Sequence, residues 1–331
     1  MTKILMTSVR PDEQKAINEF AEKHQVEIVT TAKPFIDDEV IAMTKGIDGL
    51  VIQQHANVPD NAYAILQANG LKQISTRTAG VDTINVPLAH QHGLKVTNVP
   101  AYSPRSVAEH ALMQTFRLLR KSYAFDHRVA ENDYRWAGLQ AMEIHSATIG
   151  IIGVGRIGGT LAKLLKALDA RVLGYDINPR EEMNGIVEYV SKEELLKQSD
   201  VISLHVDLND SSKGLMTSDD FKLMKPTAGL VNASRGPVVV TADLVTALQN
   251  HEIAAAALDT VEGEEHLFNQ DHRQDGLDAL PLVKQLHAMD NVILTPHIAF
   301  FTNIAVKNMV DISLTDVLTI LAGQPSPHEF N

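Results

Sequence analysis

The chain of 331 residues contains no cysteine, which excludes disulfide bonds, thiolate metal ligands and a cysteine nucleophile. It also lacks any apolar run near the roughly 18 residues of a membrane span, and its apolar N-terminal stretch is too short for a signal peptide. The net charge of −12 provides no positive field for nucleic acid or an anionic membrane. From these absences we expect a cytoplasmic protein whose partner is a small molecule.

The composition that remains is that of an ordinary globular protein, with 44% hydrophobic and 21% charged residues. The length exceeds that of a usual single domain and predicts two domains. His90 and His92 are a closely spaced pair that could suggest a metal ligand set. They lie in a helical stretch where positions two apart do not share a face, so no metal site is expected.

The most informative stretch runs from Ile149 to Asp176. The apolar run Ile149–Ile152 predicts a buried strand, and it ends at Gly153, Gly155 and Gly158. A helical pattern follows, with one predicted apolar stripe of Leu161, Leu164, Leu165 and Leu168. A second strand then ends at Asp176. The order of strand, glycines, helix, strand and acid predicts a dinucleotide site.

Each part of this pattern has a mechanical reason. Gly153 permits a tight turn, Gly155 lets the backbone approach a pyrophosphate, and Gly158 lets helix and strand pack closely. The phosphates would lie at the helix N-terminus, where free N–H groups and the helix dipole favour negative charge. Asp176 would accept hydrogen bonds from a ribose and repel the 2′-phosphate of NADP. We therefore predict NAD(H), with Arg180 as the one nearby cation that favours NADP.

Strands and helices alternate along both halves of the chain, which predicts parallel sheets flanked by helices. We expect domain crossings near Pro100 and Ala299, so that residues 1–100 plus 300–331 form one discontinuous domain and residues 101–299 the other. These crossings would hinge the domains around a cleft. The predicted strands are Ile4–Val9, Glu27–Thr31, Leu50–Gln53, Gln73–Thr76 and Lys95–Val99, followed by Ile149–Ile152, Val172–Asp176, Val201–His205, Gly229–Ala233, Ala255–Leu258 and Val292–Thr295.

Three polar side chains follow successive strands of the second predicted sheet, where parallel sheets bind their ligands. Arg235 offers a planar fork for a carboxylate. His297 can exchange a proton near neutral pH, and Glu264 could orient that histidine and stabilise its charged form. Each residue taken singly has an ordinary structural explanation. The arginine could form a surface ion pair, and the glutamate could belong to a solvated acidic loop. The chain has 14 histidines, and a single histidine is usually not catalytic. Their joint placement favours hydride transfer to a 2-keto acid.

The chain resembles the D-isomer specific 2-hydroxyacid dehydrogenase family, most closely its D-lactate dehydrogenase branch. The matching pieces span nearly the whole chain in the family's order: 77–82, 98–104, 153–158, 200–206, 232–237, 258–264 and 295–299. The resemblance implies a Rossmann domain for NAD and a flavodoxin-like substrate domain. It also implies a homodimer built on the nucleotide domain.

The resemblance assigns roles to individual residues. Arg235 would bind the substrate carboxylate, His297 would be the acid/base and Glu264 its partner. Backbone N–H groups of Ala79 and Gly80 would assist Arg235, and Tyr102 would lie in the active-site cleft. The positions that match cofactor contacts are Arg156, Ile157, Asp176, Val206, Ala233, Ser234 and Asp259.

Three positions depart from the family pattern. Asp207 replaces a usual proline, and Ser212 stands where the lactate branch often has asparagine. Ile52 occupies a site where typical D-lactate dehydrogenases have tyrosine, and a smaller side chain there would widen the substrate pocket. The preferred 2-keto acid is therefore open between pyruvate and a larger acid, as in a D-2-hydroxyisocaproate dehydrogenase.

Two further alternatives remain from the sequence. A dinucleotide-sensing protein could use the same fold without turnover. A 3-phosphoglycerate dehydrogenase shares the scaffold, but no cluster of cations near Arg77 suggests its phosphate pocket.

Overall fold

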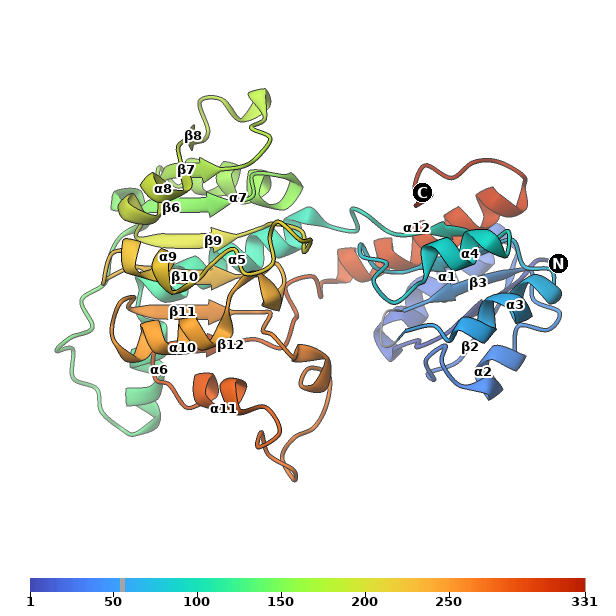
Figure 1. Ribbon diagram of the computed structural model, residues 1–331, viewed down its shortest axis with the longest axis horizontal. Coiled ribbons are helices and arrows are strands. Elements are labelled where there is room, and N and C mark those ends of the chain that lie inside the picture. The colour runs from blue at the N-terminus through green and yellow to red at the C-terminus, as the bar shows by residue number, and fades with distance from the viewer. Residues whose placement is uncertain (54–56, 331) are drawn as a thin grey trace. The chain divides into compact units, whose positions relative to one another are not determined.

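The computed structural model describes residues 1–53 and 57–330, and the chain divides into two compact units. The first unit comprises Met1–Ser103 and Phe301–Asn331, and the second comprises Pro104–Phe300. Each unit contains one parallel sheet with helices on both faces (Figure 1). The predicted α/β class is therefore confirmed.

The sheet of the first unit has five strands in the order β2-β1-β3-β4-β5, all parallel. This order is that of flavodoxin-like sheets, as the resemblance implies. The strands coincide with the predicted ones to within three residues: β1 (Lys3–Met6), β2 (Glu27–Thr30), β3 (Gly49–Ile52), β4 (Gln73–Thr76) and β5 (Lys95–Thr97).

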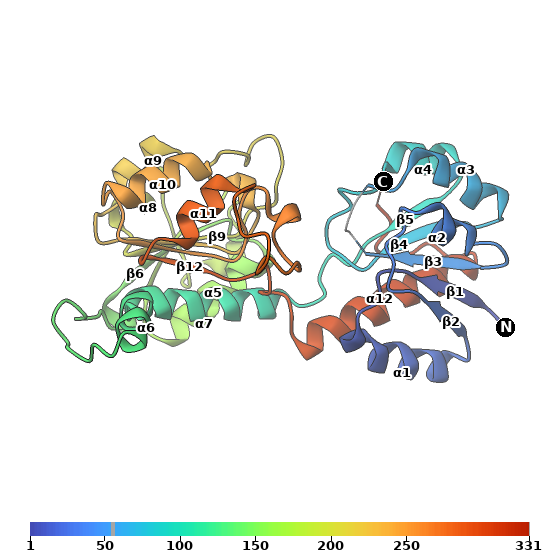
Figure 2. The same ribbon diagram turned by 90° about the horizontal axis from the view of Figure 1, so that it is seen from below.

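Two helices from opposite ends of the chain cover one face of this sheet (Figure 2). They are α1 (Gln14–His24) and α12 (Asn303–Leu321). Gly49 allows α12 to lie close, because a Cβ atom there would be 2.3 Å from Cγ1 of Val317. The other face is covered by α2 (Asp38–Ala42), α3 (Asp60–Ala68) and α4 (Val86–Gln91).

The sheet of the second unit has seven parallel strands in the order β12-β11-β10-β9-β6-β7-β8, the Rossmann order with one strand added at an edge. The strands are β6 (Thr148–Ile152), β7 (Arg171–Tyr175), β8 (Glu188–Tyr189), β9 (Val201–Leu204), β10 (Gly229–Asn232), β11 (Ala255–Leu258) and β12 (Val292–Leu294). The prediction of six strands missed β8. Two residues are too few to show a period, and β8 pairs only with β7.

Helices cover both faces of this sheet as well, as Figure 2 shows. One face carries α5 (Pro104–Leu119), α6 (Ser122–Ala130) and α7 (Arg156–Ala167), and the other carries α8 (Lys192–Gln198), α9 (Ser218–Leu223), α10 (Thr241–Gln249) and α11 (Pro281–His287). The predicted stripe on α7 was wrong at Leu168, which lies beyond the helix end and is 36% exposed. Asp169 adopts a left-handed φ of 61° there and turns the chain away.

Short 3-10 turns complete the elements: η1 (Pro11–Glu13), η2 (Ile144–Ser146), η3 (Glu181–Met183), η4 (Gly236–Val238) and η5 (Glu264–His266). Over residues 1–53 and 57–330, no helix combines the length and the apolar character needed to span a bilayer. Within the same residues, no three histidine or acidic side chains are grouped as metal ligands.

Candidate active site

The glycine loop after β6 owes its shape to two close approaches. Gly153 has a φ of +91°, and a Cβ atom there would lie 2.6 Å from the carbonyl oxygen of His205. At Gly158 a Cβ would lie 2.0 Å from the carbonyl oxygen of Gly153. By contrast, nothing lies within 4 Å of a Cβ built on Gly155. The outer two glycines are needed for packing, and the middle one leaves open space that a phosphate can enter.

Helix α7 begins directly behind this loop, with Gly155 as its N-cap. Its first N–H groups lack partners within the helix, and Arg156 and Ile157 lie in this turn. Asp176, one residue after β7, accepts hydrogen bonds from the N–H groups of Val154 (2.7 Å) and Asn178 (2.8 Å). Loop, helix start and acid together fit the phosphates and the adenosine ribose of a dinucleotide.

The remaining predicted cofactor positions follow the neighbouring strands. Val206 comes two residues after β9, and Ala233 and Ser234 follow β10 directly. The Asn232 side chain shapes the latter turn, because its Oδ1 accepts hydrogen bonds from the Ser234 N–H (3.1 Å) and hydroxyl (2.8 Å). All these positions lie at the carboxyl edge of the sheet, where such folds bind ligands.

Arg235 continues the same turn and is half-buried. Asn232 Nδ2 donates to its carbonyl oxygen (3.1 Å), and its own Nη1 donates to the Ser234 carbonyl oxygen (2.8 Å). The next residue, Gly236, is pressed against the loop after β11, since a Cβ there would be 2.2 Å from the carbonyl oxygen of Val261. That contact joins the loop of Arg235 to the loop that carries Glu264.

Glu264 and His297 form the predicted pair. Nδ1 of His297 lies 2.8 Å from Glu264 Oε1, and Glu264 Oε2 accepts the N–H of Val261 (3.0 Å). The two side chains are 38% and 21% exposed. A carboxylate at Nδ1 holds the proton on that nitrogen and leaves Nε2 as the atom that can exchange a proton with a ligand.

The backbone at His297 is unusual, because its φ of 53° lies in the left-handed region. Such a conformation costs on the order of 1–3 kcal/mol and persists only where its surroundings hold it. Asp259, only 1% exposed, supplies that support. Its Oδ1 accepts from the Thr295 hydroxyl (2.6 Å) and the Ile298 N–H (3.0 Å), and its Oδ2 from the Ala299 N–H (2.9 Å). Asp259 thus holds the loop on both sides of the histidine, a role that the sequence did not indicate.

Sequence reasoning also missed His110 on α5. Its Nε2 lies 3.2 Å from Thr295 Oγ1 and 3.4 Å from Asp259 Oδ1. Burial lowers the pKa of His110, against the opposing effect of the Asp259 charge. No motif marks this residue, because a histidine on the inner face of a helix has no pattern that separates it from an ordinary core residue.

His205, at the end of β9, was predicted only as a strand residue. Its Nε2 lies 2.8 Å from Ser203 Oγ, and its buried Nδ1 has no hydrogen-bond partner among the described residues. Burial lowers the pKa of His205 to about 4. The ring is therefore neutral at physiological pH. The backbone carbonyl group of the same residue is the one that lies against Gly153 of the cofactor loop.

The two departures that follow β9 are joined by a hydrogen bond to the Asp207 backbone. The Ser212 hydroxyl donates to the carbonyl oxygen of Asp207 (2.6 Å). The hydroxyl also accepts the N–H of Asn209 (2.9 Å), so the serine closes this loop on itself.

The predicted substrate residues of the first unit follow three adjacent strands. Ile52 is the last residue of β3 and is 1% exposed, within the apolar core. Ala79 and Gly80 follow β4, and their carbonyl oxygens accept hydrogen bonds from Asn98 Nδ2 (2.5 Å) and the Thr78 hydroxyl (2.9 Å). The carbonyl oxygen of Tyr102, in the chain beyond β5, accepts Asn308 Nδ2 (2.7 Å).

A Rossmann sheet whose carboxyl edge carries a glycine loop, an acid and a histidine–glutamate pair defines a dinucleotide-dependent oxidoreductase. Residues 112–299 match the family model described as D-isomer specific 2-hydroxyacid dehydrogenase, NAD binding domain. The chain belongs to the D-isomer specific 2-hydroxyacid dehydrogenase family, as the sequence motifs indicated, and it is an NAD-dependent oxidoreductase.

Individual relatives match this chain over nearly their full lengths. The D-2-hydroxyacid dehydrogenase (NAD(+)) of Clostridioides difficile is 41% identical, covering 96% of this chain and 97% of the relative. The D-lactate dehydrogenase of Lactobacillus delbrueckii subsp. bulgaricus is 37% identical, covering 98% and 97%. A solved D-lactate dehydrogenase from Sporolactobacillus sp. is 54% identical, with a TM-score of 0.90 over 100% of this chain and 99% of that one.

Proposed function

We propose that the protein is a D-lactate dehydrogenase that reduces pyruvate to D-lactate with NADH. The observation that carries this proposal is the 2.8 Å pair between His297 and Glu264 at the carboxyl edge of the Rossmann sheet. D-lactate dehydrogenases among the relatives, matched over nearly their whole length, support lactate as the product.

The glycine loop fits the cofactor, because the space above Gly155 is open and α7 points its N-terminus at it. Asp176 would receive the ribose, and Val206, Ala233, Ser234 and Asp259 would line the rest of the cofactor's path. When bound, NADH supplies the hydride that the reaction consumes. The protein contributes binding, orientation and the proton.

Arg235 would hold the substrate carboxylate through its planar fork of N–H donors. One of its nitrogens is anchored on the Ser234 carbonyl oxygen, which restricts how the guanidinium can swing. The backbone N–H groups of Ala79 and Gly80 would share the carboxylate, and Tyr102 and Ile52 would border the substrate. Holding the acid at one end fixes where its 2-keto group lies.

His297 would supply the proton. Reduction of the keto group adds a hydride to the carbonyl carbon and a proton to the carbonyl oxygen, and Nε2 is the histidine atom left to donate that proton. Glu264 keeps Nδ1 protonated and the ring in one orientation. In the reverse direction the neutral ring accepts the hydroxyl proton of D-lactate.

The division of labour between the units is part of the proposal. Residues 1–100 plus 300–331 would bind substrate, and residues 101–299 would bind NAD. We also propose a cytoplasmic homodimer, because the reaction draws on the NADH pool inside the cell and because α5 and α6 expose apolar side chains suited to an interface: Met113, Phe125 and Val129. Sedimentation at several concentrations tests the dimer, and cell fractionation tests the location.

The substrate test is a comparison of kcat/KM for pyruvate and 2-ketoisocaproate with NADH. A higher value for pyruvate is expected. A strong preference for the branched acid would instead assign a D-2-hydroxyisocaproate dehydrogenase, the alternative favoured by an aliphatic residue at Ile52. Failure to oxidise NADH with any 2-keto acid would contradict both assignments.

A further inference from the structure

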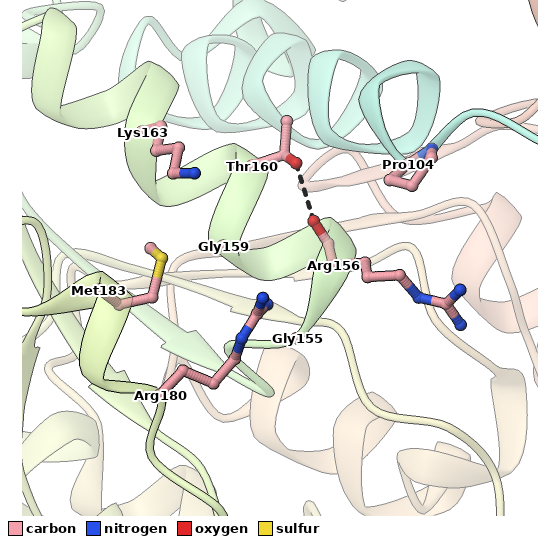
Figure 3. A pocket seen from close by; sticks show the side chains of 8 residues that line it. All are labelled: Pro104, Gly155, Arg156, Gly159, Thr160, Lys163, Arg180 and Met183. Carbon is pink, nitrogen blue, oxygen red and sulfur yellow. Dashed lines mark hydrogen bonds between the residues drawn. The ribbon is translucent and has the colours of Figure 1, made fainter. Parts of the chain in front are cut away.

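A basic cavity lies beside the cofactor loop, on the side of α7 that faces the segment before η3 (Figure 3). It has a volume of about 230 Å³, ample for a phosphate group. Three cations line it, Arg156, Lys163 and Arg180, and no acidic side chain is among the lining residues. The other lining residues are Pro104, Gly155, Gly159, Thr160 and Met183.

Two of the cations face each other across this cavity. In Figure 3, the ends of the Lys163 and Arg180 side chains both point toward the part of α7 at Gly159, whereas the Arg156 side chain points away from both of them. Nη1 of Arg180 would lie 3.7 Å from a Cβ built on Gly159, so the guanidinium rests on the helix surface. This position is a full turn beyond the N–H groups of Arg156 and Ile157, which are the ones suited to the pyrophosphate.

The cavity also includes a residue of the loop that follows the ribose-binding acid, which is where a 2′-phosphate on the adenosine ribose would lie. Asp176 marks the adenosine ribose, and Arg180 follows it by four residues on the same loop. An arginine close to the ribose acid is how dinucleotide folds accommodate a 2′-phosphate. The fork of Arg180 and the point charge of Lys163 are both phosphate ligands.

Two acids oppose such a ligand. Asp176 is the nearer to the ribose, but each of its oxygens already accepts a backbone N–H group. Glu182 forms an ion pair with Arg180, and the two side chains are 61% and 37% exposed. An exposed ion pair contributes little, so a phosphate can displace Glu182 from the guanidinium.

We propose that this cavity binds the 2′-phosphate of NADP(H), so that the enzyme accepts NADPH as a second cofactor beside NADH. The inference rests on the proposed binding of the dinucleotide at the glycine loop. It goes beyond that function, because it gives the Arg180 loop a ligand that NADH does not contain.

The test is to measure, by calorimetry, the affinity of the full chain for 2′,5′-ADP and for 5′-AMP, with no substrate present and no turnover. These ligands differ only in the 2′-phosphate. We expect both to bind, and Arg180→Ala to weaken 2′,5′-ADP by about tenfold, the loss of one charge-assisted contact, while 5′-AMP changes less than twofold. Glu182→Gln should strengthen 2′,5′-ADP several-fold, because it frees Arg180.

Lys166→Gln is the matched control, since it removes a charge from the exposed side of the same helix without lining the cavity. It should change neither affinity. Three results would overturn the proposal: 2′,5′-ADP fails to bind where 5′-AMP saturates, Arg180→Ala weakens both ligands equally, or inorganic phosphate binds through Arg180 while the two nucleotides bind alike. None of these three results would contradict the proposed NADH-dependent reduction of pyruvate, which is tested separately by kinetics.

Discussion

Each unit of the protein contains a basic side chain paired with a glutamate, and the two pairs compared here differ in exposure. In the first unit, Arg77 Nε lies 2.9 Å from Glu13 Oε1, and both side chains are fully buried. In the second, His297 Nδ1 lies 2.8 Å from Glu264 Oε1 with side chains 38% and 21% exposed. The contact distances are nearly equal, so distance alone does not separate the structural pair from the pair that we propose is catalytic.

The two pairs differ in what the remaining nitrogen atoms of Arg77 and His297 contact. The other nitrogens of Arg77 donate to the carbonyl oxygens of Thr7 and Ser8, each at 3.0 Å, and Glu13 also accepts the Arg10 N–H (2.8 Å). The guanidinium is thereby enclosed, joining the end of β4 to the loop after β1. In the proposed mechanism, by contrast, Nε2 of His297 is the atom that meets the ligand. Arg77 is thus no part of a phosphate pocket, in line with the low weight that the sequence placed on a 3-phosphoglycerate dehydrogenase.

The largest effect is expected for His297→Gln, which tests whether the partly exposed pair is catalytic. Removing a general acid is expected to lower kcat by about 10²–10⁴ while NADH affinity stays near that of the wild type, because the imidazole acts on the substrate proton. Steady-state kinetics and NADH fluorescence titration measure the two quantities. His287→Gln, on exposed α11, is the control. A variant that retains more than a tenth of the wild-type kcat would remove His297 from the proposed mechanism.

The buried pair should respond in the opposite way. Arg77→Met leaves Glu13 buried and unpaired, and we expect a loss of about 3–5 kcal/mol in the free energy of unfolding. Once folded, the variant should keep its kcat, since the Arg77 guanidinium is fully buried and bonded to protein atoms only. Urea unfolding and kinetics below the melting temperature test this. The double variant Arg77→Met/Glu13→Leu should recover most of the stability. A folded Arg77→Met protein with strongly reduced kcat would contradict the structural role.

The sequence predicted the parallel sheets and most strand positions because buried strands leave dense apolar runs between glycine and proline signals. It failed at β8 and at Leu168, where the outcome depends on pairing at a sheet edge and on a left-handed turn. Neither feature produces a periodic pattern.

The sequence predicted that Glu264 and His297 form a pair, because both follow strand ends of one sheet, and the structure places them 2.8 Å apart. The role of Arg235 stays a prediction. The residues that hold these side chains in place could not be predicted from the sequence. Asp259 was expected at the cofactor, yet its carboxylate holds the loop of His297, and His110 gave no signal at all. Such contacts join residues up to 185 positions apart, which one sequence does not reveal.

His205 sharpens the comparison, because it is a titratable group of the second unit that is buried without a counter-charge. Its pKa of about 4 in the folded protein lies below the usual value of 6.5, so the unfolded chain binds the extra proton. Stability should therefore fall as the pH drops from 6.5 toward 4, by up to about 3 kcal/mol from this group. Unfolding by urea across this pH range, compared with His205→Gln, measures the effect. Parallel curves for the two proteins would show that His205 does not carry it.

The smallest effect is expected when the same substitution, arginine to lysine, is made at Arg235 and at Arg77. Arg235→Lys replaces a bidentate fork by a point charge, which should raise KM for pyruvate by about 10–100-fold with kcat less affected. Arg77→Lys should instead lower the melting temperature and leave KM unchanged, because the fork there satisfies Glu13 and two carbonyl oxygens inside the protein. Kinetics and thermal unfolding of both variants test the contrast. If Arg77→Lys raised KM, or Arg235→Lys acted only on stability, exposure would not be what separates the arginine proposed to bind substrate from the one that stabilises the fold.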